Sequence, residues 1–364
     1  MSKVANQRKK KVLEKMKDKE IDLMVLVPGS NLNYVTGNDF GSSERLLLYF
    51  LQKNGQGYYL VPTVEKNKLK ISENDEVFSY TDEDGPSSLK DYIKTKIGEL
   101  HKTAVEDDMR LFEWQFLKAL GIVEAINSSE ILKDIRIVKS EEEVGHLRRA
   151  TRILEESLEA TLPIIEIGKS EVKIAARLEY EMKIRGSEGT PFSTIVASGY
   201  RGALPHGRAS EKVIEDGDLI VIDFGSIVNG YVGDMTRTIG VGNVSDKKRN
   251  VYDVVKNAIL SSINSIEFGT KACDVDVAAR QVISDAGYGQ YFTHRLGHGI
   301  GLDAHEEPYI SSSNQEKLLP GMSFTIEPGI YIENQFGIRI EDNIVITENG
   351  MENLMNMNHD MIVV

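Results

Sequence analysis

The chain of 364 residues has little cysteine, little tryptophan and no long apolar run. Its single cysteine, Cys273, excludes an internal disulfide and is typical of a reducing compartment; we expect it to be a small buried residue on a helix. No apolar stretch follows the N-terminal charges as in a signal peptide, and no run approaches the roughly 18 residues of a membrane span. These features favour a cytoplasmic protein without membrane partners.

Positive charge is also scarce. Lys and Arg total 43 against 56 Asp and Glu, so the net charge is -13. This balance argues against a nucleic-acid partner, because few cations remain to follow a phosphate backbone. The basic run Arg8-Lys9-Lys10-Lys11 precedes apolar residues at helical spacing, which predicts a solvated first helix rather than a targeting or nucleic-acid patch.

The first third of the chain alternates strand and helix patterns, and we expect residues 1–125 to form a small α/β domain. Strands are predicted at 21–27, 45–50 and 57–61, and helices at 87–100 and 113–120, with Trp114 in the core. This segment has no convergent acidic set, so we assign it no chemistry. Residues 126–139 are predicted to be a linker that ends in a strand-like stretch, Ile135-Arg136-Ile137-Val138.

A second domain is expected over residues 140–364, within an α/β (α+β) protein. Ser140 and Glu143 have capping-box spacing, which predicts a helix to about residue 162. Further helices are predicted at 170–185, 247–266 and 274–286, and strands at 192–198, 218–224, 231–241, 323–332 and 337–347. Because helices followed by a carboxylate-bearing hairpin occur twice, we expect an internal duplication with sheet enclosed by helices.

Two aspartates flank the first of these hairpins. Asp223 closes the apolar run 219–222, and Asp234 lies eleven residues on, beyond Asn229-Gly230, a dipeptide that favours tight turns. We therefore expect the two aspartates to occupy roughly facing positions. Like charges that face each other are destabilising, and carboxylates beside apolar strands are costly unless they are compensated.

Two glutamates repeat the pattern near the C-terminus. Glu327 ends the run 324–326 and Glu341 follows 338–340, with Gly337 in the expected connection. Two hairpins that each present a carboxylate pair predict a bound cation. Oxygen ligands with one imidazole suit Mn²⁺, Co²⁺ or Zn²⁺. Bridging carboxylates hold two ions about 3.5–4 Å apart, an arrangement that makes a hydroxide at neutral pH and polarises a carbonyl.

Other polar side chains accompany the carboxylates. Arg339 lies two residues before Glu341, hence on the same strand face, where its guanidinium is placed to pair with a carboxylate of the site or of a substrate. Tyr331 shares a face with Glu327, and both a supporting hydroxyl and a plain core aromatic remain open for it. Four of the seven histidines fall within one hundred residues, and their clustering makes them site candidates: His206, His294, His298 and His305.

From about residue 140 the chain resembles the pita-bread metallopeptidases, which include methionine aminopeptidase, Xaa-Pro aminopeptidase, prolidase and the metal-free creatinase. The resemblance rests on Ala203-Leu204-Pro205-His206-Gly207, Asp223-Phe224-Gly225, Gly233-Asp234-Met235-Thr236-Arg237-Thr238, Gly297-His298-Gly299-Ile300-Gly301, His305-Glu306, Glu327-Pro328-Gly329-Ile330-Tyr331 and Arg339-Ile340-Glu341-Asp342. Val232-Gly233 departs from the Cys-Ser common in that family, and we expect only a local packing change. The N-terminal domain resembles the creatinase-type domain in size and pattern only.

The resemblance implies a fold and a division of roles. The fold is a creatinase-like α/β domain followed by a pita-bread domain with a pseudo-twofold antiparallel sheet. Asp223 would hold one divalent ion, His298 and Glu327 the other, and Asp234 and Glu341 would bridge the two. A bridging hydroxide would attack the scissile carbonyl. Glu327 would transfer the proton, His206 and His305 would bind substrate and steady the intermediate, and His294 would line the subsite beyond the scissile bond; Arg339, from its strand position, is a further candidate for substrate binding.

All five ligand positions are filled, which argues against metal-free chemistry, and the histidine set resembles the proline-specific branch. A proline nitrogen has no N–H, so such a peptidase must recognise ring shape. The expected activity is hydrolysis of the Xaa-Pro bond, in dipeptides or at the N-terminus of longer peptides, by a homodimer with two metal ions per chain, Mn²⁺ favoured. Alternatives are a same-fold metallohydrolase of a non-peptide amide or small osmolyte derivative, and a non-catalytic binding relative.

Overall fold

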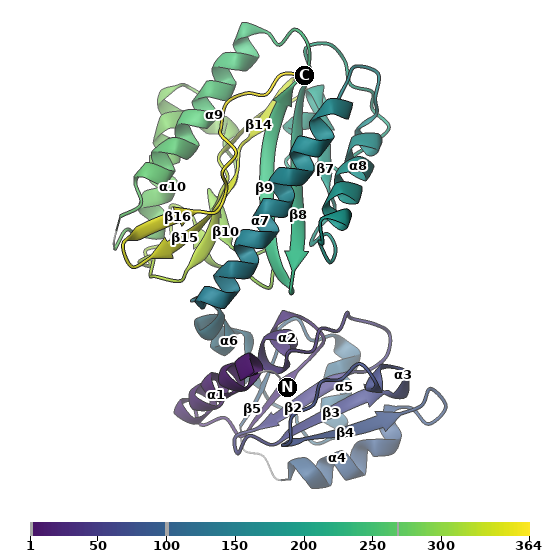
Figure 1. Ribbon diagram of the computed structural model, residues 1–364. Coiled ribbons are helices and arrows are strands. Elements are labelled where there is room, and N and C mark those ends of the chain that lie inside the picture. Colours follow the sequence, from purple (N-terminus) through teal and green to yellow (C-terminus); the bar gives the residue numbers. More distant parts are fainter. Residues whose placement is uncertain (1–2, 99–101, 268) are drawn as a thin grey trace. The chain divides into compact units, whose positions relative to one another are not determined.

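The computed structural model describes residues 3–98, 102–267 and 269–364 (Figure 1). The chain divides into two units, Met1–Arg136 and Ile137–Val364. Among the described residues, no helix combines the length and apolar character that a membrane crossing requires.

A mixed six-stranded sheet with the order β4-β3-β2-β1-β5-β6 forms the centre of the first unit. Its strands are β1 (Leu23–Leu26), β2 (Leu48–Gln52), β3 (Gly57–Pro62), β4 (Asp75–Tyr80), β5 (Thr103–Val105) and β6 (Ile126–Asn127). The helices of this unit are α1 (Lys3–Asp18), α2 (Ser30–Thr36), α3 (Thr63–Lys66), α4 (Lys90–Ile97), α5 (Leu111–Ala119) and α6 (Ser129–Arg136), with the 3₁₀ helix η1 (Pro86–Leu89) before α4. The α/β class predicted for this segment is confirmed.

The predicted elements of the first unit differ from the observed ones at their ends. The helix predicted at 87–100 begins as η1 and continues as α4, and its last two predicted residues lie outside the described residues. The strand-like stretch predicted at Ile135–Val138 is wrong in its first half, because Ile135 and Arg136 end α6, whereas Val138 forms an isolated β-bridge with Met322. Ile131, Leu132 and Ile135 bury one face of that helix, and this spacing of apolar residues fits a helix better than a strand.

Three antiparallel sheets form the second unit. One has the order β7 (Ile195–Ser198), β8 (Leu219–Val228), β9 (Tyr231–Gly240). Another has the order β11 (Glu306–Ile310), β10 (Gly297–Gly299), β12 (Ser323–Ile326), β15 (Asp342–Thr347), β16 (Gly350–Asn353), and the third is the hairpin of β13 (Gly329–Ile332) and β14 (Phe336–Arg339). The strands carry apolar residues toward two separate cores, one for each half of the unit.

Two pairs of helices accompany these sheets: α7 (Glu141–Thr161) with α8 (Glu171–Ile184), and α9 (Asp246–Asn264) with α10 (Ala272–Asp285). Figure 1 shows α7 lying across β8 and β9, whereas α9 and α10 lie beside each other on the opposite flank. The predicted capping box is present, because the Ser140 N–H donates to the Glu143 carboxylate at 2.7 Å and the Ser140 hydroxyl accepts from the Glu143 N–H at 3.4 Å. A helix pair and a carboxylate-bearing hairpin thus occur twice, as expected.

The two long C-terminal strands predicted from the sequence are each interrupted. The ladder pairs Ile326 with Asp342 and resumes with Gly329 opposite Arg339, in the same register. The turn lies at residues 333–335, where Asn334 has a φ of 58°, so the expected connection at Gly337 is wrong. Gly337 is in β14, where an added Cβ would lie 1.9 Å from the carbonyl oxygen of Gly202. Its lack of a side chain therefore serves a close backbone approach rather than a turn.

Candidate metal centre and active site

A cavity of about 840 Å³ in the second unit collects the polar residues of both halves; we call it the central cavity. All nine site residues predicted from the sequence line it: His206, Asp223, Asp234, His294, His298, His305, Glu327, Arg339 and Glu341. They come from separate stretches of the chain between residues 206 and 341, so the fold brings them together.

The hairpin of β8 and β9 places Asp223 and Asp234 on one face of the sheet, but not opposite each other. Asn229 and Gly230 have φ values of 50° and 79°, which confirms the tight turn. This turn pairs Val228 with Tyr231, and consequently Asp223 with Thr236 and Gly225 with Asp234. The two aspartates roughly face each other, as expected, but are offset by two residues from direct pairing. A shift of two keeps both side chains on the same face, since side chains alternate with period two.

The interruption of the second hairpin releases Glu327 and Glu341 to reach other strands. Their positions are opposite in the register shared by the two ladder segments. The Glu327 N–H donates to the Leu296 carbonyl at 2.8 Å, and the Glu341 N–H donates to the Thr236 carbonyl at 3.1 Å. Glu327 is thereby tied to the segment that contains His298, and Glu341 to the strand that contains Asp234.

Three of the five predicted metal ligands already form a compact group. Ligand atoms of Asp234, His298 and Glu341 all lie within 4.8 Å of one another. The His298 Nε2 atom is 3.2 Å from a Glu327 oxygen and 4.0 Å from an Asp234 oxygen. Asp223 lies in the same cavity and is ion-paired with Arg339. Four carboxylates thus surround one imidazole.

The buried oxygens of this group are not satisfied by the protein. Asp223 Oδ1, Asp234 Oδ1 and Glu341 Oε1 have no hydrogen-bond partner within the described ranges. Burial and the neighbouring carboxylates raise the pKa of Asp234 and of Glu341 well above the ordinary range, and burial raises that of Asp223 despite Arg339. Unpartnered buried carboxylates are strongly destabilising unless a cation compensates them. The donor set therefore fits divalent metal ions.

The histidine in this group has the orientation of a ligand. His298 Nδ1 lies 3.1 Å from the Gly299 carbonyl oxygen, which can only accept, so Nδ1 is assigned the proton. The lone pair of Nε2 then points toward the carboxylates of Glu327 and Asp234. Two electron-rich groups at this separation need a cation between them, which is either a proton, as in the His298–Glu327 hydrogen bond, or a bound metal ion.

Glu327 differs from the other carboxylates in its ionisation. Burial alone would raise its pKa, but the hydrogen bond and charge of His298, with His294 and Arg339, outweigh burial and lower the pKa of Glu327 to about 2. The Thr325 hydroxyl also donates to it at 3.2 Å. Glu327 is therefore ionised at neutral pH and can accept a proton from water within hydrogen-bonding reach.

A chain of hydrogen bonds links Asp223 to the histidine side of the cavity. Arg339 pairs with Asp223 and donates to the Tyr331 hydroxyl at 2.6 Å, which lies 3.0 Å from His294 Nε2. Burial raises the pKa of Tyr331 to about 12, so its phenol stays protonated and donates to His294. Of the two interpretations left open for Tyr331, the supporting hydroxyl is correct, and Arg339 pairs with a carboxylate of the site.

His305 and His206 line the same central cavity. The His305 ring centroid is 4.0 Å from that of His298. Burial and the charge of His298 lower the pKa of His305 to about 4, so its imidazole is neutral at pH 7 and can donate one N–H. His206 is exposed to solvent in the cavity and belongs to a loop that precedes β8.

Three supporting residues were missed by the sequence analysis. The Thr236 hydroxyl donates to Glu341 at 2.7 Å, the Asn343 amide bonds the backbone of Asp234 in both directions, and Thr325 contacts Glu327. Each stands two positions from a predicted ligand in sequence. The period-two rule for strands was the available signal, and it was applied only to Arg339 and Tyr331.

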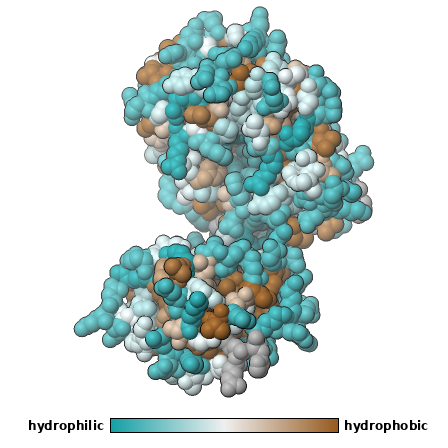
Figure 2. All heavy atoms as spheres, turned by 180° about the vertical axis from the view of Figure 1, so that it is seen from behind, coloured by the Kyte–Doolittle hydropathy of each residue, from teal (hydrophilic) through white to brown (hydrophobic). Residues whose placement is uncertain are grey.

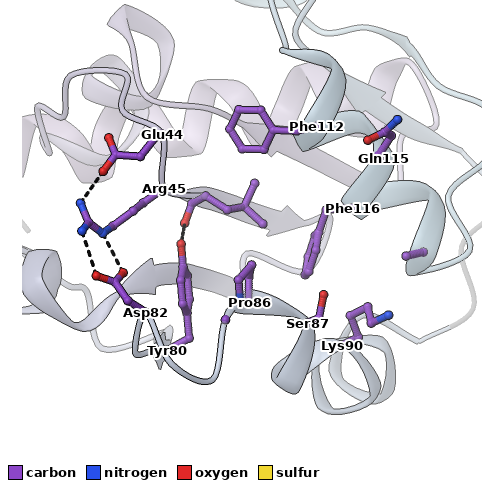
Figure 3. A pocket seen from close by; sticks show the side chains of 13 residues that line it. Glu44, Arg45, Tyr80, Asp82, Pro86, Ser87, Lys90, Phe112, Gln115 and Phe116 are labelled. Carbon is purple, nitrogen blue, oxygen red and sulfur yellow. Dashed lines mark hydrogen bonds and ion pairs between the residues drawn. The ribbon is translucent and has the colours of Figure 1, made fainter.

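A second cavity, of about 450 Å³, lies in the first unit (Figure 3). The Arg45 guanidinium there is bound on both sides, to Glu44 at 2.7 Å and to Asp82 at 2.8 Å, and Phe112 and Phe116 form apolar walls. Both carboxylates here are ion-paired and neither has a buried unpartnered oxygen among the described residues, unlike Asp223, Asp234 and Glu341 of the central cavity.

Comparison with known proteins agrees with this geometry. Residues 145–348 match the model of metallopeptidase family M24, and residues 8–138 match the creatinase/prolidase N-terminal domain. An Xaa-Pro dipeptidase from Pyrococcus horikoshii is 37% identical over 360 residues, which cover 99% of each chain. A recombinant prolidase from Thermococcus sibiricus superimposes with a TM-score of 0.95 at 33% identity and full coverage of both chains. An X-Pro aminopeptidase from Thermotoga maritima gives a TM-score of 0.87 at 34% identity, covering 98% of this chain and 99% of its own.

Proposed function

Because this chain belongs to metallopeptidase family M24, we propose that it is a metal-dependent peptidase that cleaves the bond between an N-terminal residue and proline. The observation that carries the proposal is the group of buried carboxylates with unpartnered oxygens, set beside three further histidines in the central cavity. We take Xaa-Pro dipeptides as the preferred length, since the Pyrococcus horikoshii relative is named an Xaa-Pro dipeptidase. The Thermotoga maritima neighbour is named an X-Pro aminopeptidase, so longer peptides are the alternative.

We propose two divalent ions per chain, with Mn²⁺ favoured and Co²⁺ or Zn²⁺ as alternatives. Asp223 would hold one ion, His298 and Glu327 the other, and Asp234 and Glu341 both. The unpartnered oxygens support this assignment, because Asp223, Asp234 and Glu341 each have one to offer. When bound, such ions activate water and polarise the scissile carbonyl.

The side chains of the cavity would move the protons of the reaction. Glu327, ionised at neutral pH, accepts a proton as water adds to the carbonyl carbon. The same carboxyl then gives that proton to the proline nitrogen as the C–N bond breaks. Neutral His305, opposite His206, donates an N–H to the oxygen on which negative charge develops, a form of stabilisation that is strong in a buried site.

Recognition of proline would depend on shape, because its nitrogen carries no N–H in the substrate. Phe192, Pro205 and the His294 ring line the cavity and offer surfaces for a five-membered ring. The Arg339 guanidinium also lines the cavity but is committed to Asp223 and Tyr331. We therefore propose that Arg339 acts on the substrate by fixing Asp223 and, through Tyr331, the His294 ring.

The test measures release of free amino acid from Xaa-Pro dipeptides and Xaa-Pro tripeptides, after metal removal and after addition of Mn²⁺, Co²⁺ or Zn²⁺. We expect no release by the metal-free protein and restored release with metal, faster from dipeptides. No release with any of the three metals, or equal release from matched Xaa-Ala peptides, would contradict the proposal. In that case a panel of non-peptide amides and small osmolyte derivatives tests the alternative metallohydrolase. Metal binding without any hydrolysis identifies a binding relative.

Assembly and location complete the proposal. We propose a homodimer, for which the apolar residues gathered on the visible face of the first unit offer surface (Figure 2). Leu111 is 71% exposed and Val123 is 69% exposed in that unit. The single buried cysteine, Cys273, supports a cytoplasmic location. Sedimentation velocity of the purified protein measures the oligomeric state, and a monomer at all concentrations would contradict the dimer.

A further inference from the structure

The position of His206 is not fixed by its own side chain. Its ring makes no hydrogen bond to any part of the chain that the structure describes, and the residue is exposed in the central cavity. The backbone of residues 198–210, here called the His206 segment, must therefore determine where the imidazole lies. Within it, a 3₁₀ helix at Gly199–Ala203 is followed by short turns: the Leu204 N–H donates to the Arg201 carbonyl and the Gly207 N–H donates to the Leu204 carbonyl, both at 2.9 Å.

Both ends of the His206 segment converge on one buried carboxylate, that of Glu171. One Glu171 oxygen accepts from the Ser198 N–H at 2.7 Å and from the Ser198 hydroxyl at 2.9 Å. The other accepts from the Ser210 N–H at 3.0 Å and from the Ser210 hydroxyl at 2.7 Å. The Glu171 side chain is fully buried. A single residue thus closes a loop of thirteen residues whose middle lies in the cavity.

Arg201 extends this anchor toward His206. Its Nε atom donates to Glu171 at 3.0 Å, and its Nη2 atom donates to the Arg208 carbonyl at 2.6 Å, two residues after His206. The ion pair compensates the buried charge of Glu171 and simultaneously holds the second arm of the loop. Glu171 is also the first residue of α8, where a negative charge is favoured by the helix dipole.

A backbone contact supports the middle of the segment. An added Cβ on Gly202 would lie 3.1 Å from the Gly337 nitrogen, so the segment runs directly against β14, the strand that ends at Arg339. The loop is therefore held at its two ends by Glu171, at its middle by β14, and at Arg208 and Ser210 by backbone contacts with Ile195 and Val172. Of these contacts, only the Glu171 carboxylate can be changed without altering the backbone of the cavity.

We propose that Glu171 is a positioning residue for His206, which sets the place of that imidazole relative to the metal-binding carboxylates. The inference rests on the proposed peptidase function. Glu171 does not line the central cavity, and it touches neither the metal-ligand candidates nor the space for a substrate. Its effect on hydrolysis passes through His206.

The test is a double-mutant cycle of Glu171→Gln with His206→Ala, measured on an Xaa-Pro dipeptide with bound metal. Glu171→Gln keeps the shape but replaces one acceptor oxygen by an N–H₂ group and removes the charge that holds Arg201. We expect kcat to fall roughly tenfold to hundredfold, because displacements of about 1 Å have effects of this order. In the His206→Ala background the same change should alter kcat by no more than about twofold, which is the precision to which independent effects add. An effect that did not pass through His206 would instead be retained in full.

Glu155 offers a matched control in the same unit. Its buried carboxylate also accepts backbone N–H bonds, from Asn356 and Met357, and it does not line the central cavity. Glu155→Gln should lower stability without changing kcat, with or without His206. If Glu171→Gln behaves like this control, or if its effect on kcat is fully retained after His206→Ala, the positioning role is refuted.

A milder variant and a direct readout guard against loss of folding. Ser210→Ala removes one hydrogen bond to Glu171 and should reduce kcat by a smaller factor that also disappears in the His206→Ala background. Hydrogen exchange at the Leu204 and Gly207 amides should accelerate in Glu171→Gln and not in Glu155→Gln. Unchanged exchange would contradict the proposal even if activity fell. Absence of hydrolysis by the unmutated protein, or full activity of His206→Ala, would instead count against the proposed function.

Discussion

Two adjacent residues of the second unit, Glu341 and Asp342, show how differently one fold treats buried carboxylates. On the cavity side, Glu341 keeps an unpartnered oxygen and its pKa is raised well above the ordinary range by burial and by Asp234. On the other side, Asp342 binds Arg237 at 2.8 Å and His359 at 2.7 Å. Burial alone would raise the pKa of Asp342, but these partners lower it to about 2.

This difference distinguishes a carboxylate that maintains the fold, Asp342, from one that is available to bind a cation, Glu341. Arg237 also donates to the Glu341 and Met357 carbonyls, so the ion pair of Arg237 with Asp342 fixes both the backbone at Glu341 and the C-terminal segment. A satisfied buried ion pair stabilises a local geometry, whereas an unsatisfied carboxylate stores unfavourable energy until a cation binds. The cavity side is therefore the side where metal binding contributes folding energy.

The largest expected effect comes from neutralising the cavity side. Asp234→Asn or Glu341→Gln should abolish hydrolysis, by at least about a thousandfold, which exceeds the typical loss from removing one stabilising donor. Each change also removes a carboxyl group whose ionisation is opposed by burial and by its acidic neighbours, so the metal-free variant should be at least as stable as the metal-free parent. Steady-state kinetics, metal analysis and thermal unfolding in chelator measure this. Full activity in either variant would refute the assignment to two metal ions.

Neutralising Asp342, whose carboxylate is ion-paired, should have the opposite effect on stability. Asp342→Asn leaves the Arg237 guanidinium buried without its counter-charge, and we expect the free energy of unfolding to fall by about 3–5 kcal/mol. Urea unfolding of the metal-free protein measures the change. If Asp342→Asn and Glu341→Gln alter stability equally, the distinction between the two sides is wrong.

The first unit provides a third kind of buried carboxylate, one with partners but a raised pKa. Glu106 accepts from the Val27 N–H at 2.6 Å and from the Asn31 amide at 2.8 Å, yet burial raises its pKa to about 7. The folded state therefore binds a proton that the unfolded state has released between about pH 4.5 and 7. Stability should fall over this interval as pH rises, by up to about 3 kcal/mol.

Glu106→Gln checks this pH dependence, because the amide does not titrate. The slope of unfolding free energy against pH between 4.5 and 7 should become flatter than in the parent, measured by urea unfolding monitored at the single Trp114, which lies in the first unit. An unchanged slope would show that Glu106 is not protonated in the folded state.

The smallest expected effect concerns the hydroxyl that joins Arg339 to His294. Tyr331→Phe removes that oxygen and keeps the ring, so the fold should be preserved while activity or metal affinity falls roughly 10- to 100-fold. Kinetics over a metal titration separate the two effects. If the variant keeps wild-type activity and wild-type metal affinity, the Tyr331 hydroxyl has no role in the site and the residue serves packing alone.

Much of this site could be predicted from the sequence, because its residues are marked by patterns within short segments. The Asn229-Gly230 turn, the apolar runs that precede each acid and the histidine-containing loops all mark short segments whose chemistry is evident from neighbours. The order of the ligand candidates along the chain then indicates that the four acids belong together.

What the sequence did not predict depends on pairing across the fold. The two-residue offset of Asp223 from Asp234 follows from the turn register, and the break at Glu327 and Glu341 follows from backbone bonds to Leu296 and Thr236. Neither partner is near in sequence. The same holds for Gly337, whose role is a contact with Gly202, and for Glu171, which joins the ends of a loop that follows it.

Anomalous diffraction at the manganese edge, on crystals grown with Mn²⁺, addresses the unpartnered carboxylates most directly. We predict two peaks per chain, contacted by oxygens of Asp223, Asp234, Glu327 and Glu341 and by His298 Nε2. Crystals that show no peak among these atoms, with the carboxylates hydrogen-bonded to water or to one another instead, would contradict a metal centre in this cavity.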